Sequence, residues 1–344
     1  MSSTQKALVV TELGKPVKLI EDRLIPEPSA KQIQLKVKVA GINPHDQKAR
    51  DWGLFIAQHL PALLTNDVVG TVTKLGEGVT GVAVGDRVVT QPGFSPGFTQ
   101  NGLQEFAVAD VGAFGKIPEG TSDDEAATLP TNIIAPLVAI FEVLKIPAPW
   151  SGQKFDYANT TLLVVGGGSN CGRFGVQLAK LAGIGRIVVV GGNEAELKSY
   201  GATHVLDRHG GQDAVLARIR DVVGDDLVYA YDAISPPEDQ VLALNALSST
   251  KKGALARLLP LGPVDESKVV GKTAGFEVRD TYGSSQVHPE LAGGFWERLP
   301  GFLETGKIKP LSYVVKQGLT AENLNEVLDA YRDGKTVKKT HIHV

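Results

Sequence analysis

Cysteine is almost absent from this chain, which has one, Cys171, among 344 residues. A single cysteine excludes an intrachain disulfide and any metal site built from several thiolates. The start of the chain, MSSTQKALVV, lacks the apolar core of a secretory signal, and no apolar run approaches the about 18 residues of a membrane span. The formal net charge of −3 gives no bulk attraction to nucleic acid or anionic membrane. We therefore expect a cytoplasmic protein with no nucleic-acid or membrane partner.

The composition that is present, 42% hydrophobic and 21% charged, is that of an ordinary soluble protein. A chain of 344 residues is long enough for two domains. The first 125 residues contain short strand-like runs punctuated by Gly, Pro and Asn, which predicts a compact β domain with long surface loops. These runs lie at 6–10, 33–39, 68–75, 86–90 and 103–108.

The pattern changes near Ser122, which fits a helix N-cap with Glu125 at the capping-box position. Pro130 and Pro136 are expected to divide the following helical stretch into two pieces. From residue 160, strands and helices alternate, which predicts a doubly wound parallel sheet. The expected strands are 161–165, 186–190, 204–206, 227–231 and 253–261, and the expected helices are 173–182, 194–200, 212–223 and 237–248.

The end of the chain departs from this alternation. It predicts helices near 295–305 and 320–333 and strands at 312–315 and 340–344, a pattern that does not continue the parallel sheet. We therefore expect the tail to return to the first domain. The predicted boundaries are 1–125, completed by 300–344, for the β domain and 126–299 for the doubly wound domain.

A cluster of glycines at 166–172 lies between an apolar strand and an amphipathic helix. Glycine is costly inside regular elements, so such a cluster marks a tight turn or a close backbone approach. At a helix N-terminus, unpaired amides and the helix dipole favour an anion, and absent β-carbons let a pyrophosphate approach. Gly166, Gly168 and Gly172 have the spacing of a dinucleotide-binding variant. The loop therefore predicts a bound dinucleotide.

Four stretches together resemble the medium-chain dehydrogenase/reductase superfamily. They are AGINPHDQKARD (40–51), DVVGTVTKLGEGVTGVAVGDRVV (67–89), LVVGGGSNCGRFGVQLAKLAG (163–183) and SYGATHVLD (199–207). The chain looks most like the fungal zinc-independent branch, which includes trans-acting enoyl reductases and related quinone or aldehyde reductases. The resemblance implies an α/β protein with a GroES-like β domain and a Rossmann domain.

The positions of the family's catalytic zinc ligands carry other residues in this chain. Asn43 stands where zinc-dependent relatives have a cysteine, and Asn66 and Asp67 stand where they have a His-Glu pair. Residues 90–102 hold no counterpart of the four-cysteine structural lobe. His341 and His343 share one face of the last strand, where we expect a solvated face rather than a site. No metal is expected.

Without a metal Lewis acid, the remaining chemistry is hydride transfer to an acceptor that is already electrophilic, such as a conjugated carbonyl. Lys48, in the early loop, matches a lysine that lies beside the nicotinamide ribose in the enoyl-reductase relatives. Asn43 is expected to orient the same region. We take Lys48 and Asn43 as the catalytic candidates; no Tyr, Ser or His emerges as a proton donor, and solvent could serve.

The second strand of the nucleotide unit ends without the carboxylate that usually holds an NAD ribose. Lys198 matches a position that contacts the 2′-phosphate in NADPH-using relatives, so we predict NADPH. Because Glu194 is close enough to bind a ribose diol, NADH stays an alternative. The predicted cofactor-binding residues are Gly166, Gly167, Gly168, Ser169, Asn170, Cys171, Gly172, Gly191, Gly192, Asn193, Lys198 and Lys48.

Three functions are compatible with these residues. The first is an NADPH-dependent reductase of activated C=C bonds in an enone or enoyl thioester, which includes carrier-bound thioesters. The second is an aldehyde, carbonyl or quinone reductase, and the third is a non-catalytic nucleotide-binding protein. The partner in each case is a small molecule, and the chain is expected to be a monomer or homodimer.

Overall fold

The computed structural model describes residues 3–93, 96–259 and 261–344. They divide into two compact units, residues 1–131, 285–306 and 310–344 in the first and 132–284 with 307–309 in the second. The division lies a few residues after the predicted boundary at 125, and the chain re-enters the first unit at 285 instead of 300. The earlier return follows from the helix Pro289–Glu304, whose Trp296 donates a hydrogen bond to Ser285 within the first unit.

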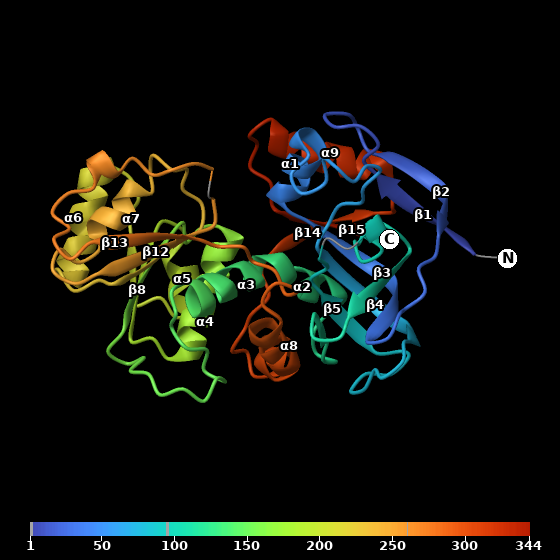
Figure 1. Ribbon diagram of the computed structural model, residues 1–344, viewed down its shortest axis with the longest axis horizontal. Helices are drawn as coiled ribbons and strands as arrows, with labels where there is room; N and C mark the ends of the chain where they lie inside the picture. Colours follow the sequence, from blue (N-terminus) through green and yellow to red (C-terminus); the bar gives the residue numbers. More distant parts are fainter. Residues whose placement is uncertain (1–2, 94–95, 260) are drawn as a thin grey trace. The chain divides into compact units, whose positions relative to one another are not determined.

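The first unit is built on a sheet with the strand order β14-β15-β3-β4-β5-β7, in which β6 also pairs with β3 (Figure 1). A separate ribbon is formed by β1 (Thr4–Val9) and β2 (Lys18–Leu24). The other strands are β3 (Gln32–Ile42), β4 (Asp67–Leu75), β5 (Arg87–Thr90), β6 (Phe106–Asp110), β7 (Phe114–Lys116), β14 (Tyr313–Gln317) and β15 (Lys339–His343).

The last strand, β15, lies between β14 and β3 and pairs antiparallel with β3, so the chain end is an interior strand of the first unit's sheet. Helix α9 (Ala321–Arg332) precedes it and buries Leu324, Val327 and Leu328 in the same hydrophobic cluster as the N-terminal strand residues Leu8 and Val9. Helix α8 (Pro289–Glu304) packs against β7 through Trp296 and Leu299. The tail thus completes the first unit's core.

One predicted loop is a helix. Residues Pro44–Trp52 form α1, although the segment was expected to be irregular. Pro44 suits the first helical position because its missing N–H would be unpaired there. Asp46 accepts a hydrogen bond from the backbone N–H of the N-cap Asn43, at 2.8 Å, and Gly53 ends the helix in the left-handed conformation.

The stretch after Ser122 forms α2 (Asp123–Ala127) and α3 (Pro130–Leu137), followed by a π-helical segment, η2 (Val138–Val143). The predicted capping box is confirmed, since Ser122 accepts from the N–H of Glu125 and Glu125 accepts from the N–H of Ser122. The expected break at Pro136 is wrong. Pro136 lies inside α3, and the helix widens directly after it because proline cannot donate the usual i→i−4 bond.

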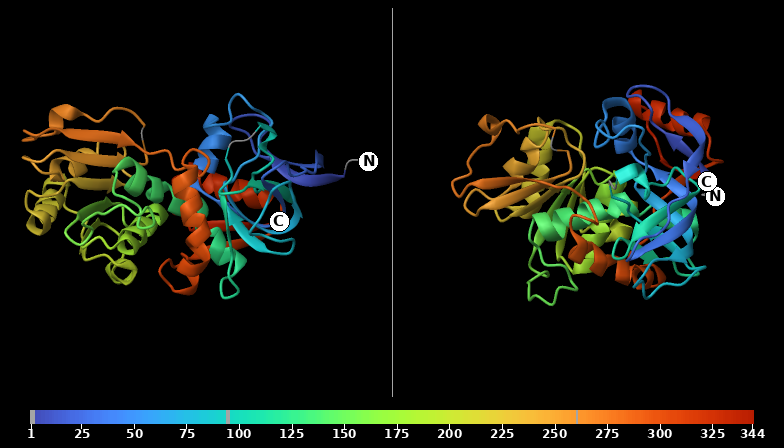
Figure 2. Two further views of the ribbon diagram at one scale, coloured as in Figure 1. Left: turned by 60° about the horizontal axis from the view of Figure 1, so that its bottom comes forward. Right: turned by 45° about the vertical axis from the view of Figure 1, so that its right-hand side comes forward.

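The second unit is a six-stranded parallel sheet in the order β10-β9-β8-β11-β12-β13, the doubly wound arrangement predicted from the sequence. Helices α4 and α5 cover one face and α6 and α7 the other (Figures 1 and 2). The elements are β8 (Thr161–Val165), α4 (Asn170–Ala182), β9 (Arg186–Val190), α5 (Glu194–Tyr200), β10 (His204–Leu206), α6 (Gln212–Val223), β11 (Tyr229–Asp232), α7 (Val241–Ala246), β12 (Gly253–Arg257) and β13 (Phe276–Asp280).

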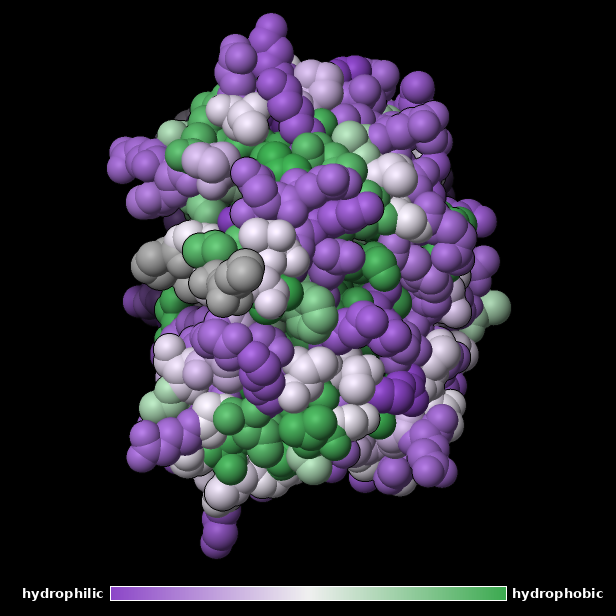
Figure 3. Space-filling view, turned by 90° about the vertical axis from the view of Figure 1, so that its right-hand side faces the viewer, coloured by the Kyte–Doolittle hydropathy of each residue, from purple (hydrophilic) through white to green (hydrophobic). Residues whose placement is uncertain are grey.

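The face of the first unit drawn in Figure 3 is mostly hydrophilic, with hydrophobic side chains gathered in separate patches. Among the described residues, no helix combines the length and the apolar character needed to cross a bilayer.

The two histidines of β15 are not on a solvated face, contrary to the expectation. His341 is fully buried, stacks on Tyr313 with ring centroids 5.0 Å apart, and contacts Asp124 of α2 through Nδ1 at 2.9 Å. His343 Nε2 contacts the same carboxylate at 3.0 Å. These contacts attach the C-terminal strand to α2.

We predict that His341→Gln makes the unfolding free energy less dependent on pH between 7 and 5. Burial lowers the pKa of His341 from 6.5, and Lys339 nearby lowers it further, while Asp124 and Asp67 raise it in part. The folded state then binds fewer protons than the unfolded state below pH 6.5, so the wild type loses stability as the pH falls. Urea unfolding at several pH values measures this slope, with the exposed His59→Gln as the control. Equal slopes in wild type and His341→Gln would contradict the assignment.

Candidate functional site

The glycine loop joins the end of β8 to the start of α4, as predicted. Gly166 has φ of +85°, a conformation that glycine adopts without strain. A β-carbon on Gly172 would lie 2.2 Å from the carbonyl oxygen of Gly166, and one on Gly167 would lie 2.2 Å from Val189. These glycines are therefore required by close packing of the loop against itself and against β9.

Two side chains hold the loop in shape. Ser169 is the N-cap of α4, and its hydroxyl accepts from the N–H of Gly172 and donates to the carbonyl of Gly166, each at 2.9 Å. Arg173 donates to the carbonyl of Gly168 at 2.6 Å and to Glu196 of α5 at 3.0 Å. Arg173 was not identified from the sequence. Because its guanidinium is paired with Glu196, Arg173 fixes the loop in place at a helix N-terminus that itself favours an anion.

A cavity of about 880 Å³ lies along this loop within the second unit. Its size suits a nucleotide, and it lies at the carboxyl ends of the parallel strands, where doubly wound sheets bind ligands. The lining residues are Val165, Gly166, Gly168, Ser169, Val190, Gly191, Gly192, Glu194, Val205, Leu206, Asp207, Arg208, His209, Gly211, Gln212, Val215, Ile234, Ser235, Asp239 and Leu242.

Five of the predicted cofactor residues line this cavity: Gly166, Gly168, Ser169, Gly191 and Gly192. Three more of the predicted residues lie at the starts of helices. Asn170 and Cys171 are the first two residues of α4, and Asn193 is the N-cap of α5. Cys171 is partly exposed, and its Sγ lies 4.0 Å from Asn132 Oδ1.

The predicted phosphate contact, Lys198, is not among the lining residues. Its ammonium pairs with Glu194 at 2.6 Å instead. Arg208, which sequence reasoning missed, does line the cavity and lies close to Gly191. The sequence feature that could have identified Arg208 is its position just after β10. The carboxyl ends of adjacent parallel strands meet at one edge of the sheet, so a residue there lies near the end of β9.

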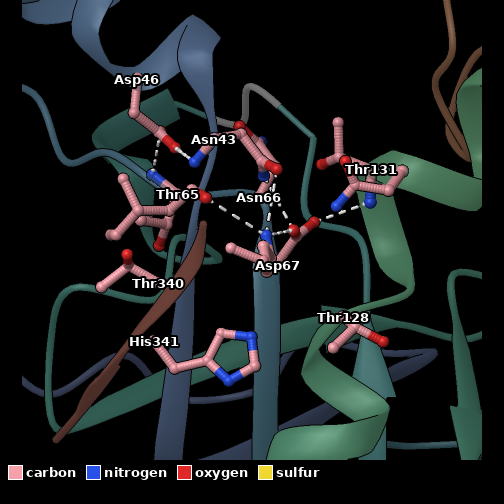
Figure 4. Close-up of polar contacts among 12 residues, drawn as sticks. Asn43, Asp46, Thr65, Asn66, Asp67, Thr128, Thr131, Thr340 and His341 are labelled. Carbon is pink, nitrogen blue, oxygen red and sulfur yellow. Dashed lines mark hydrogen bonds and ion pairs between the residues drawn. The ribbon is translucent and has the colours of Figure 1, made fainter. Parts of the chain in front are cut away.

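A second group of polar residues lies in the first unit, around the start of α1 (Figure 4). Its centre is Asp67, which is fully buried and forms an ion pair with the ammonium of Lys339. Asp67 also accepts from the side-chain amide of Asn43, at 2.7 Å, and from the backbone N–H of Thr131, at 2.6 Å. Lys339 in turn donates to the amide oxygen of Asn43, at 3.0 Å.

The two buried carboxylates of this group have opposite pKa shifts. Burial alone raises the pKa of Asp67, but the charge and hydrogen bond of Lys339, with the N–H of Thr131 and the amide of Asn43, lower it overall. Burial raises the pKa of Asp46, and the neighbouring His45 with the N–H groups of Asn43 and Thr65 offsets that only in part. Asp67 is therefore the anion that balances Lys339.

Lys48 lies on α1 in the same unit, half-buried, and burial lowers its pKa. Asn43 is buried, and both ends of its amide are engaged by Asp67 and Lys339. Lys48 thus belongs to the first unit together with Asn43, while all the other predicted cofactor residues belong to the second.

The residues at the family's zinc positions do not fit that metal. Zinc sites use thiolates, imidazoles and carboxylates at about 2.0–2.3 Å. Here two of the positions are the amides Asn43 and Asn66, and the carboxylate of Asp67 is occupied by an ammonium. No group of three or more metal-ligating side chains suited to an ion occurs within residues 3–93, 96–259 and 261–344.

Comparison with known proteins agrees with these features. Residues 29–137 match the alcohol dehydrogenase GroES-like domain. The chain is 30% identical to the trans-enoyl reductase tazE of Aspergillus terreus over 75% of this chain and 86% of that protein. A putative zinc-dependent alcohol dehydrogenase of Rhizobium etli has the same fold at 20% identity, with a TM-score of 0.82 over 100% of this chain and 99% of the other.

A mycobacterial protein complexed with NADPH has a TM-score of 0.73 at 22% identity, over 99% of this chain and 100% of the other. The GroES-like match, the identity to tazE over most of both chains, and the strand order of the second unit agree with one another. The chain therefore belongs to the medium-chain dehydrogenase/reductase superfamily, in the branch of the trans-enoyl reductases and quinone oxidoreductases, and is an oxidoreductase with a nicotinamide cofactor.

Proposed function

We propose that the protein is a zinc-independent reductase that uses NADPH to reduce the activated C=C bond of an enone or enoyl thioester. The observation that carries this proposal is the ammonium of Lys339, held by Asp67 and Asn43 among the family's metal positions. An ammonium cannot polarise an unconjugated carbonyl as a metal does. This favours an acceptor that is electrophilic already, as a conjugated carbonyl is, and the name of the relative tazE agrees with such a substrate.

When bound, the nicotinamide cofactor supplies the hydride. The amides at the start of α4, with Ser169 and Arg173 fixing the loop, are suited to its pyrophosphate. Lys48 is assigned to the nicotinamide ribose, in line with its position in the related reductases. Asn43 serves as a positioning residue, because both ends of its amide are already engaged by Asp67 and Lys339.

A labelling experiment tests the reaction. With NADPH carrying deuterium at C4 of the nicotinamide and an enone as acceptor, we expect a saturated ketone with the deuterium at its β-carbon. Label at the carbonyl carbon, in an allylic alcohol, would indicate the carbonyl-reductase alternative. Binding of NADPH without turnover of enones, thioesters, aldehydes or quinones would leave the non-catalytic alternative.

The absence of a metal in the reaction is tested separately. Activity is expected to survive prolonged dialysis against a strong chelator, and elemental analysis is expected to find well below one zinc per chain. The reason is that Asp67 is already neutralised by Lys339, so zinc has no free carboxylate there. A stoichiometric zinc whose removal abolishes activity would overturn the zinc-independent mechanism.

The preference for NADPH rests on the charges at the far end of the nucleotide cavity. The carboxylates that line the cavity are engaged, because Glu194 pairs with Lys198, Asp207 contacts His209 at 2.6 Å, and Asp239 accepts a hydrogen bond from Gln212 at 3.1 Å. Arg208 is exposed and, within the described part of the chain, makes no ion pair or side-chain hydrogen bond. A guanidinium without a carboxylate partner is suited to a 2′-phosphate, which distinguishes NADPH from NADH.

We predict that Arg208→Ala weakens NADPH binding by about 10- to 100-fold, the loss of a charged hydrogen bond worth about 1.5–3 kcal/mol. NADH affinity should change by less than about twofold, since NADH has no 2′-phosphate. Fluorescence titration of both coenzymes measures this. Lys198→Ala is the matched control, because that cation is paired with Glu194 and should matter less. A larger loss in Lys198→Ala than in Arg208→Ala would restore the prediction made from the sequence.

A further inference from the structure

His45 lies in the first turn of α1, and its ring is held in a defined orientation. Its Nε2 lies 3.1 Å from Oδ1 of Asn66, an acceptor that fixes the proton on this nitrogen. Asn66 is itself held by a hydrogen bond to the carbonyl of Pro92, at 2.8 Å. The other ring nitrogen, Nδ1, has no hydrogen-bond partner among the residues that the structure describes, and the side chain is 23% exposed.

The spacing along α1 places His45 next to Lys48. Residues three apart on a helix have their β-carbons about 5–6 Å apart on one face. Trp52 continues this face one turn further and is exposed. The helix therefore presents an imidazole, an amine and an indole in a row, and Lys48 is the member of that row assigned to the cofactor.

His45 also lines a small cavity of about 10 Å³ within the first unit. The other polar residues of this cavity are Asp46, Asn66 and Asn101, and its remaining walls are apolar. Asn101 is 1% exposed, and its Oδ1 is a buried acceptor without a partner in the described part of the molecule. A space of this size with an unpaired acceptor is about the minimum that takes one water molecule.

We propose that His45 is the proton donor that completes the reduction, delivering a proton from Nδ1 to the α-carbon of the enolate. This rests on the proposed function. Hydride addition to the β-carbon moves the C=C electron pair into an enolate, which must gain one proton to become the saturated carbonyl. The imidazolium gives that proton and becomes neutral, and solvent restores the proton to this partly exposed side chain. The net reaction consumes one substrate, one NADPH and one proton.

Histidine is the side chain that exchanges its proton between pH 5 and 8, which general acid catalysis near neutral pH requires. Asp46 Oδ1 lies 3.6 Å from Nε2, and Lys48 follows three residues later on the same face of α1. No other charged side chain of the described residues forms an ion pair with His45.

The test compares wild type with His45→Gln, which keeps an amide donor for Asn66. We expect turnover of an α-methyl enone to fall by about 10²-fold, with the affinity for NADPH within about twofold of the wild-type value. The decrease in wild-type kcat with rising pH should be absent from the variant. In D₂O the wild type should place deuterium on one face of the α-carbon and the variant on both, because water then supplies the proton without orientation.

His59→Gln, a change of an exposed histidine in the turn after α1, is the matched control and should behave as wild type. His45→Ala with added imidazole provides a second variant, in which rescue by the free base is expected. If wild type reduces the enone and His45→Gln keeps its rate, pH profile and stereochemistry, the assignment of His45 is wrong. If wild type reduces no enone or enoyl thioester, the proposed function fails and this proposal fails with it.

Discussion

The ion pair between Lys339 and Asp67 is the contact on which the first unit depends most. Both side chains are almost completely buried, and they join the last strand of the chain to β4. A buried ion pair is tolerated only when further hydrogen bonds compensate the loss of hydration, as Asn43 and Thr131 do here. Loss of one partner would leave a buried charge, which commonly costs about 3–5 kcal/mol.

The same ion pair also links the fold of the first unit to the residues of α1 that we assign to the reaction. Asn43 belongs to the ion-paired cluster through its side chain and to α1 as its N-cap, so the cluster fixes where the helix begins. His45 and Lys48 follow within the first turn and a half, and their orientation is therefore set by a contact with the far end of the sequence. The cation that occupies the metal positions and the framework that presents the proposed proton donor are parts of one network.

The sequence predicted the second unit well because its determinants are local. Strand–turn–helix periodicity and the spacing of Gly166, Gly168 and Gly172 are visible within a short window, and β8, β9, β10, α5 and α6 occur with the predicted boundaries. The first unit was predicted less completely. Lys339 and Asp67 are 272 residues apart, and neither residue indicates its partner by any local pattern. Helix α1 was missed because its sequence, PHDQKARDW, is short and mostly polar, and its capping by Asp46 had to be recognised instead.

The nucleotide cavity shows a different limit of sequence analysis. Lys198 lies in the helix after the second strand and Arg208 lies just after the third, and residue type alone does not separate these two cations. What separates them is their neighbours: Glu194, one helical turn before Lys198, pairs with its ammonium, whereas Arg208 forms no ion pair with any carboxylate of the described residues. To bind a phosphate, a cation that already has a carboxylate partner must share or give up that contact, whereas a cation without one need not. The coenzyme selectivity of such a cavity therefore depends on which charged side chains remain unpaired. The folded structure decides this, and the number of cations in the sequence motif does not reveal it.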